Sequence, residues 1–311
     1  MKNYKQIFDE VQKELSKVVI GQESVIEQIL VCILCDGNAL LEGYPGLAKT
    51  LTVKTLAEMM DLKFSRIQNT PDLMPSDIMG TYIIEEVSGK RQFKFQPGPV
   101  FSNIVLADEI NRATPKTQSA LLEAMQEKQV TAGINTFKLD LPFFVLATQN
   151  PIEQEGTYPL PEAQADRFLL KIKVGYPDFE QEVKIVDMYS TEAKDRKVKK
   201  MLNKNHLLTL QAYTRQVPIA NDIQRRAVKL INTTRTSKDI IQYGASPRAS
   251  IGIILAAKAR ALINGRNHVS NEDIDAMAFP ILRHRIILNF EAERKGLTVE
   301  DAIDHLVKKV K

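Results

Sequence analysis

The feature that most constrains this chain is a glycine-bearing loop between a predicted strand and a predicted helix. Residues 43–50 read GYPGLAKT, follow the apolar run ALLEG and open a helix predicted from 49 to 60. A tight loop in this position turns successive backbone N–H groups inward, and the helix N-terminus adds the positive end of its dipole. Such a unit binds the phosphates of a nucleotide, so the chain must contain a strand–loop–helix core of the P-loop kind.

Within this loop, Lys49 is predicted to contact the β and γ phosphates of ATP, and Thr50 to ligate Mg²⁺. Ala48 occupies the position where the general motif has its second glycine. We expect alanine to be tolerated there if the residue already has helical dihedral angles. The predicted contacts of the loop are Gly43, Tyr44, Pro45, Gly46, Leu47, Ala48, Lys49, Thr50 and Leu51.

Apolar runs at 38–43, 64–69, 103–109, 143–150 and 168–174 alternate with segments of helical pattern such as 49–60 and 115–127. Near-continuous apolar runs are typical of strands covered on both faces. Their alternation with helices predicts right-handed βαβ units. The fold class is therefore α/β, a P-loop NTPase with an αβα parallel-sheet core.

Two of these strands end in further polar residues. The run NIVLADE ends in Asp108 and Glu109, and FFVLATQN ends in Asn150. Carboxylates at a buried strand end are costly unless a cation or a proton transfer uses them. We predict that Asp108 holds Mg²⁺, that Glu109 is the general base for water, and that Asn150 orients the water or contacts the γ phosphate.

Two stretches interrupt the alternation and predict β-hairpins inserted in the core. One spans 81–96 around Ser88 and Gly89, and the other spans 129–141 around 133–135. After residue 177 strand signals stop and helices follow, at 178–189, 207–216, 222–234, 246–265 and 270–282. We therefore predict a nucleotide-binding core at 1–177 and an all-α lid at 178–311.

Bulk properties exclude several classes of protein. The 42 basic and 38 acidic residues give a net charge of +4, too small to indicate nucleic acid. The charged, amphipathic start and the absence of a long apolar run predict a cytoplasmic protein without a membrane span. The two cysteines, Cys32 and Cys35, lie three apart in an apolar helical segment without further metal ligands, so we interpret them as core thiols. The charged run 194–204 could bind nucleic acid, but such a run is more often a solvated loop.

The motifs together resemble the AAA+ ATPases and, within them, the MoxR family. The segments that carry the resemblance are GYPGLAKT, ADEINRA, ATQNP, EGTYPLPEAQADRF and GASPRA, with VIGQ at 19–22 similar to the family's nucleotide-flanking element. The resemblance implies that Gly21 and Gln22 flank the nucleotide and that Asn150 is sensor 1. It also implies that Arg167 is an arginine finger directed at a neighbouring subunit, and that Arg248 is a sensor 2 directed at the nucleotide of its own subunit.

The resemblance further implies a homo-oligomeric ring, commonly a hexamer, that acts with partners bearing von Willebrand factor A domains in the maturation of other complexes. Arg112 is an additional interface candidate. Two alternatives stay open, a P-loop motor acting on nucleic acid and a nucleotide switch that does not hydrolyse. The small net charge argues against the first, and the presence of Glu109, Asn150 and Arg167 together argues against the second.

Overall fold

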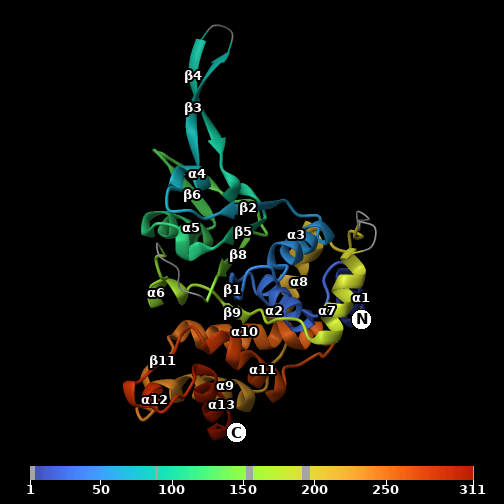
Figure 1. Cartoon of the computed structure of the whole chain (residues 1–311), viewed down its shortest axis with the longest axis vertical. Helices are drawn as coiled ribbons and strands as arrows, with labels where there is room; N and C mark the ends of the chain where they lie inside the picture. Colours follow the sequence, from blue (N-terminus) through green and yellow to red (C-terminus); the bar gives the residue numbers. More distant parts are fainter. Residues whose placement is uncertain (1–3, 88–89, 152–156, 191–196, 311) are drawn as a thin grey trace.

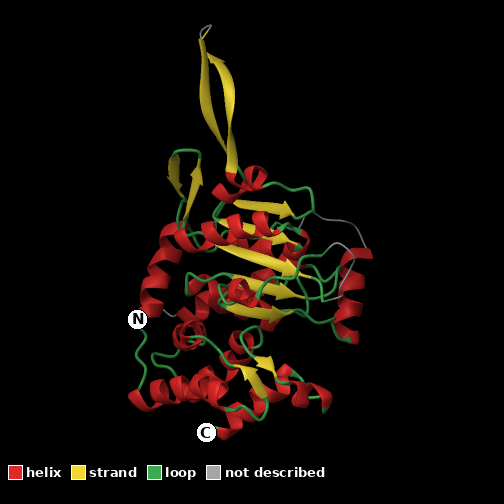
Figure 2. Cartoon of the chain, turned by 90° about the vertical axis from the view of Figure 1, so that its left-hand side faces the viewer, coloured by secondary structure: helices red, strands yellow, loops and turns green. Residues whose placement is uncertain are grey.

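A computed structural model describes residues 4–87, 90–151, 157–190 and 197–310. At its centre lies a parallel sheet with the strand order β2-β5-β8-β1-β9, which Figure 2 shows with its strands running in one direction. The strands are β1 (Ala39–Glu42), β2 (Phe64–Gln68), β5 (Ile104–Asp108), β8 (Phe144–Gln149) and β9 (Leu170–Lys173). Each of the five apolar runs contains one of these strands, so the predicted α/β parallel sheet is confirmed.

Both faces of the sheet are covered by helices. Side chains alternate between the faces, so Leu41 and Leu106 join one buried cluster while Leu40 and Val105 join the other. The first cluster includes residues of α1 (Tyr4–Leu15), α2 (Glu23–Leu34) and α3 (Lys49–Met59), and the second includes residues of α4 (Pro75–Met79) and α5 (Pro115–Glu127). Figure 1 shows these two groups on opposite sides of the strands.

The two predicted hairpins are present. One consists of β3 (Gly80–Val87) and β4 (Lys90–Pro97), and the other of β6 (Gln129–Ala132) and β7 (Asn135–Lys138). The predicted turn residues Ser88 and Gly89 lie outside the described residues. The short hairpin touches the long one near the base of β3–β4, because Asn135 donates a hydrogen bond to Tyr82 and the rings of Phe95 and Phe137 stack at 4.2 Å between centroids. The long β3–β4 hairpin projects from the body (Figure 1), which leaves its sides open to other molecules.

The C-terminal part contains the five predicted helices and several elements that we did not predict. The predicted ones are α7 (Phe179–Ser190), α8 (Lys204–Gln216), α9 (Asn221–Thr236), α10 (Pro247–Ile263) and α11 (Asn271–Leu282). The additional ones are α12 (Phe290–Arg294), α13 (Val299–Lys309), and the paired strands β10 (Ile241–Tyr243) and β11 (Ile287–Leu288). The prediction that strands stop at residue 177 was therefore wrong, because strands of three and two residues are too short to show a periodic pattern.

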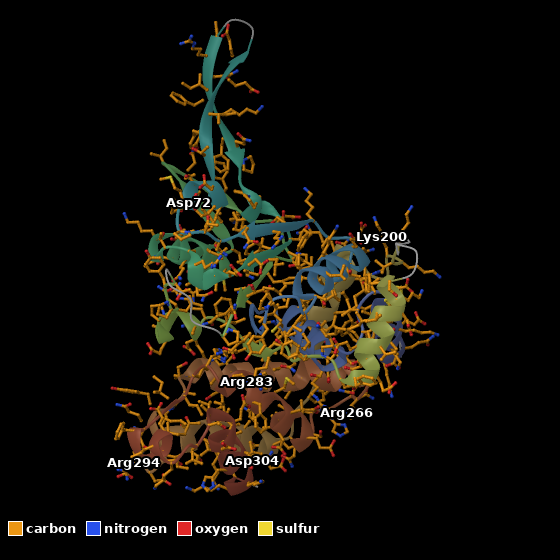
Figure 3. All side chains as sticks on the ribbon, in the orientation of Figure 1. Asp72, Lys200, Arg266, Arg283, Arg294 and Asp304 are labelled. Atoms are coloured by element: carbon orange, nitrogen blue, oxygen red, sulfur yellow. The ribbon has the colours of Figure 1, made fainter. Side chains whose placement is uncertain are left out.

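The helical part packs directly on the sheet. Arg283, labelled in Figure 3, donates a hydrogen bond to the carbonyl of Lys171 in β9 at 3.0 Å. Gln211 of α8 donates to the carbonyl of Ile33 in α2 at 2.7 Å. One continuous apolar cluster extends from the sheet into α8–α11 and α13. The domain boundary at 177 therefore remains a prediction.

The basic run at 194–204 contacts the core through its described residues. Lys200 pairs with Asp61 at the C-terminal end of α3 at 2.6 Å (Figure 3), and Lys204 pairs with Asp140. Residues 194–196 lie outside the described part. These ion pairs with acidic residues of the same chain agree with the interpretation of the run as a surface loop.

The two cysteines are buried core thiols, as predicted. Cys32 lies in α2 and Cys35 is its C-cap, and burial raises the pKa of both thiols well above the usual range. Among the described residues there is no group of three His, Cys, Asp or Glu side chains that could hold a metal ion. The described helices include none that is both long and apolar enough to cross a membrane.

Candidate nucleotide-binding site

The P-loop and the polar strand ends surround one cavity of about 430 Å³ at the carboxyl edge of the sheet. It is lined by Pro45, Gly46, Leu47, Ala48, Lys49, Thr50, Leu51, Arg66, Gln68, Asp108, Glu109, Thr148 and Asn150. The predicted residues Gly43 and Tyr44 do not line it. A side chain at Gly43 would place its Cβ 2.6 Å from the carbonyl oxygen of Val174, and the ring of Tyr44 stacks on Tyr176 at 5.3 Å. These two residues pack against the segment that follows β9 and so hold the loop in place, outside the cavity.

The loop has the geometry of a phosphate cradle. Gly46 has a φ of +84°, and a Cβ added there would meet no atom within 4 Å, so its backbone faces open space. The ammonium group of Lys49 donates a hydrogen bond to the carbonyl of Gly43. Burial lowers the pKa of Lys49, and the charges of Asp108 and Glu109 oppose that shift. Gln22 donates to the carbonyl of Leu47 at 2.6 Å, so the predicted flanking element holds the loop itself.

Ala48 adopts a conformation that we did not expect. It is the N-cap of α3, with a φ of +53° and a ψ of +18°, in the left-handed region. The condition under which we expected alanine to be tolerated without strain is therefore not met. A left-handed conformation brings the alanine Cβ close to the following carbonyl oxygen, at a cost of about 1 kcal/mol. The chain keeps alanine at the position where the general motif has glycine, and it carries this local strain.

Replacing Ala48 with glycine is expected to raise the free energy of unfolding by about 1 kcal/mol, because glycine adopts a positive φ without steric cost. Urea denaturation followed by circular dichroism would measure the change. Ala120, inside α5, is the matched control, and Ala120→Gly should lower the free energy of unfolding by about 0.5–1 kcal/mol. If Ala48→Gly has the same free energy of unfolding as the parent or a lower one, the left-handed conformation of Ala48 does not strain the loop.

Asp108 and Glu109 are fixed by side chains from both neighbouring strands. Thr148 of β8 donates its hydroxyl proton to Oδ1 of Asp108 at 2.6 Å, and Arg66 of β2 donates to Oδ2 at 2.6 Å. The backbone N–H of Glu109 donates to the Thr148 hydroxyl oxygen at 2.8 Å, and Glu109 has a φ of +53°. The Glu109 carboxylate pairs with Arg112 at 3.1 Å. Both acids therefore lie in the same cavity as the P-loop, in fixed orientations.

The cavity fits a Mg²⁺–nucleotide complex. Thr50 and Asp108 both line this cavity and offer oxygen ligands, which Mg²⁺ prefers. Mg²⁺ sites at nucleotides use only one or two protein oxygens, with phosphates and water supplying the others. The absence of a larger acidic cluster among the described residues is consistent with such a site.

A second cavity of about 210 Å³ adjoins the first and shares Gly46, Leu47, Ala48 and Leu51 with it. Its other lining residues are mostly apolar, namely Val18, Val19, Ile20, Gly21, Gln22, Pro177, Ile185 and Tyr189. Tyr189 of α7 donates a hydrogen bond to the carbonyl of Val18 at 2.8 Å, which closes this space. Its size and character suit a planar base. Sequence reasoning found only Gly21 and Gln22, because the residues of α7 carry no motif.

Arg167 lies at the opposite edge of the sheet. Leu169, two residues further on, donates its N–H to the carbonyl of Asn38, immediately before β1, whereas the P-loop follows the other end of β1. The four residues of β1 separate the two edges by about 13 Å. Arg167 borders a different cavity, of about 340 Å³, together with Glu123 and Glu127. Its guanidinium has no hydrogen bond or ion pair with any residue in the described ranges.

Arg248 also lies at that edge and does not line the P-loop cavity. Its guanidinium pairs with Asp166 at 3.4 Å, and Ser246, the N-cap of α10, donates to the same carboxylate at 2.9 Å. The buried Arg285 donates to Asp166 at 2.7 Å and to the carbonyl of Leu169 at 3.0 Å. Arg285 thus binds residues on both sides of Arg167 and fixes the backbone there, a role that no sequence motif indicated. The expected contact of Arg248 with the nucleotide of its own chain does not agree with this arrangement.

Comparison with known proteins agrees with the fold. Residues 38–170 match the model of the ATPase family associated with various cellular activities (AAA), and residues 233–306 match that of the AAA lid domain. The fold and the site thus define an AAA ATPase with an α/β core and a lid.

Full-length relatives narrow the class. Chaperone MoxR1 of Mycobacterium tuberculosis is 44% identical over 96% of this chain and 80% of its own length. Protein MoxR of Paracoccus denitrificans is 30% identical over 93% of this chain and 92% of its own. A crystal structure from Cytophaga hutchinsonii has a TM-score of 0.92 at 48% identity, covering 99% of this chain and 95% of that one. The chain belongs to the MoxR family of AAA+ ATPases, as its motifs predicted.

Proposed function

We propose that this chain hydrolyses ATP with Mg²⁺ and uses the energy to remodel partner protein complexes. The observation that carries the proposal is the convergence of Lys49, Thr50, Asp108, Glu109 and Asn150 on one cavity beside the P-loop. Adenine would occupy the adjoining apolar cavity. A nucleotide switch would not need a carboxylate in the position of Glu109.

In this proposal Lys49 and the loop amides bind the β and γ phosphates, and Thr50 and Asp108 hold Mg²⁺. The bound cation supplies neutralisation of the phosphate charge. Glu109 accepts the proton of the attacking water, and Asn150 orients that water. Thr148 acts as a positioning residue, because its hydroxyl binds both the Asp108 carboxylate and the Glu109 backbone.

We infer that Arg167 and Arg248 complete the site of a neighbouring subunit. Both lie at the sheet edge opposite the P-loop of their own chain, within reach of a copy docked head to tail. A head-to-tail interface closes into a ring when its rotation allows. We propose a hexamer, in which each nucleotide lies between two protomers, and we assign Arg248 to the neighbour's nucleotide instead of its own.

We propose that client proteins bind the β3–β4 hairpin, because it projects from the body and because one relative is named a chaperone. The M. tuberculosis relative is named a chaperone, and we extend that activity to this chain. The projecting β3–β4 hairpin exposes large apolar side chains, with Phe93 77% and Ile84 64% accessible. Exposed apolar groups at such a site favour contact with other proteins. A protein with a von Willebrand factor A domain is the proposed partner, and the cytoplasm is the proposed location.

The steady-state ATPase rate per protomer, measured against protein concentration with Mg²⁺ present, tests this function. We expect the rate to climb with concentration and then saturate, because an arginine from the next protomer completes each site. The size of the assembly at each concentration is measured by light scattering. Hydrolysis by a species that scattering shows to be monomeric would contradict a site shared between subunits. Absence of hydrolysis at every concentration would contradict the proposed ATPase activity.

A further inference from the structure

The P-loop cavity contains a second cation that the motifs do not account for. Arg66 lies in β2, the edge strand of the sheet. Its Nε and Nη2 both donate to Oδ2 of Asp108, at 3.1 and 2.6 Å, and Nη2 also donates to Gln68 at 2.6 Å. The register of β2 on β5 places Gln68 opposite Asp108, so the strand pairing itself holds the three side chains together.

Arg66 is the cation that pairs directly with Asp108, and Lys49 adds a charge interaction with the same carboxylate. The side chain of Asp108 is 13% exposed, and a carboxylate with so little solvent needs a counterion. Thr148 supplies a neutral donor to Oδ1, whereas Arg66 supplies the positive charge at Oδ2. Arg66 is 47% exposed, so its guanidinium can move into the open cavity without leaving water for an apolar environment.

We propose that Arg66 is a positioning residue that occupies Asp108 until a divalent cation takes its place. This inference rests on the proposed nucleotide and Mg²⁺ site. A guanidinium and a divalent cation attract the same carboxylate and repel each other, so each weakens the binding of the other. While no metal is bound, Arg66 stays paired with Asp108 and offsets a negative charge that would otherwise repel the phosphates. Arg66 therefore strengthens nucleotide binding without metal and reduces the additional affinity that the metal confers.

The test compares Arg66→Gln with the parent protein. The dissociation constant of a fluorescent ADP is measured in EDTA and in excess Mg²⁺. The quantity compared is the constant in EDTA divided by the constant in Mg²⁺, which measures the affinity that the metal adds. We expect the ratio to increase about three- to tenfold in the variant, because the competing charge is gone and screening limits the effect. Arg66→Lys keeps the charge and should retain a ratio near that of the parent. An unchanged or smaller ratio in Arg66→Gln would overturn the proposal.

Two further measurements test the competition between Arg66 and the metal independently of the ADP ratio. The affinity of Mn²⁺ for the ADP complex, followed by electron paramagnetic resonance, should rise in Arg66→Gln and in Arg66→Met, a second neutral variant that guards against a folding defect. In an Asp108→Asn background, Arg66→Gln should no longer change the ratio, since the shared carboxylate is absent. A ratio that still changes there would also overturn the proposal.

Failure of this inference is distinguishable from failure of the proposed function. Lys49→Ala tests the nucleotide site directly, because it removes a loop cation and leaves Arg66 in place. If Lys49→Ala binds ADP as tightly as the parent does, the nucleotide site itself is wrongly assigned. If Lys49→Ala loses binding while Arg66→Gln keeps the parent ratio, the site stands and only the role of Arg66 is overturned.

Discussion

Replacing Glu109 with glutamine is expected to lower the ATP hydrolysis rate by about 10² to 10⁴-fold while nucleotide binding is retained. An amide has nearly the size of a carboxylate but cannot accept the proton of the attacking water. The change leaves in place Lys49 and the loop amides that we propose bind the phosphates, and Thr50 and Asp108, the proposed Mg²⁺ ligands. Single-turnover hydrolysis and a separate binding titration would measure the two effects.

Glu58→Gln is the matched control for this prediction. Glu58 lies in α3, the helix that follows the P-loop, and its side chain is exposed. The same substitution there should leave both binding and turnover unchanged. A Glu109→Gln variant with the turnover of its parent would remove Glu109 from the role of base. A loss of binding would instead indicate that the pair of Glu109 with Arg112 shapes the cavity.

The sequence was sufficient to predict the sheet and the polar residues that line the P-loop cavity. Five apolar runs became five strands, and Lys49, Thr50, Asp108, Glu109 and Asn150 meet in one cavity. The reason is local, because a parallel sheet brings the carboxyl ends of its strands to one edge. Residues that follow such strands therefore meet wherever the intervening helices lie.

The residues that the sequence did not reveal act through contacts between distant segments. Tyr189 of α7 closes the apolar cavity beside the P-loop, and Arg285 holds the backbone around Arg167 from the loop after α11. No pattern within either segment indicates the partner. The dihedral angles of Ala48 could not be predicted for a related reason. The left-handed turn is set by how the loop joins β1 to α3, and the residue type alone does not report it.

Arg248 shows how position in the fold changes an interpretation. A cation at the N-terminal end of α10 faces the positive end of the helix dipole, which favours an anion nearby, and the structure supplies one, the carboxylate of Asp166. Arg248 is 52% exposed in this pair, and exposed ion pairs contribute only about 0–1 kcal/mol. Exchange of this carboxylate for a neighbour's phosphate would therefore cost little. Arg167 and Arg248 are thus available together at one surface.

Replacing Arg167 with alanine is expected to lower turnover by about 10³ to 10⁵-fold, the contribution of an arginine finger, with nucleotide binding retained. The guanidinium lies across the sheet from the P-loop of its own chain, so its loss leaves that cavity intact. Arg225→Ala is the control, because Arg225 is an exposed arginine of α9 on the lid. It should hydrolyse ATP like the parent. Steady-state turnover and ADP affinity of both variants would be compared.

Mixing Arg167→Ala with Lys49→Ala distinguishes an arginine that acts on the neighbour from one that acts within its own chain. An Arg167→Ala protomer keeps its own P-loop, and a Lys49→Ala protomer keeps its arginine. A site formed between them in one orientation therefore contains both groups, and in the other orientation it contains neither. Mixed rings should regain activity that neither variant has alone. If light scattering shows mixed rings and turnover stays at the level of the separate variants, Arg167 does not act across the interface.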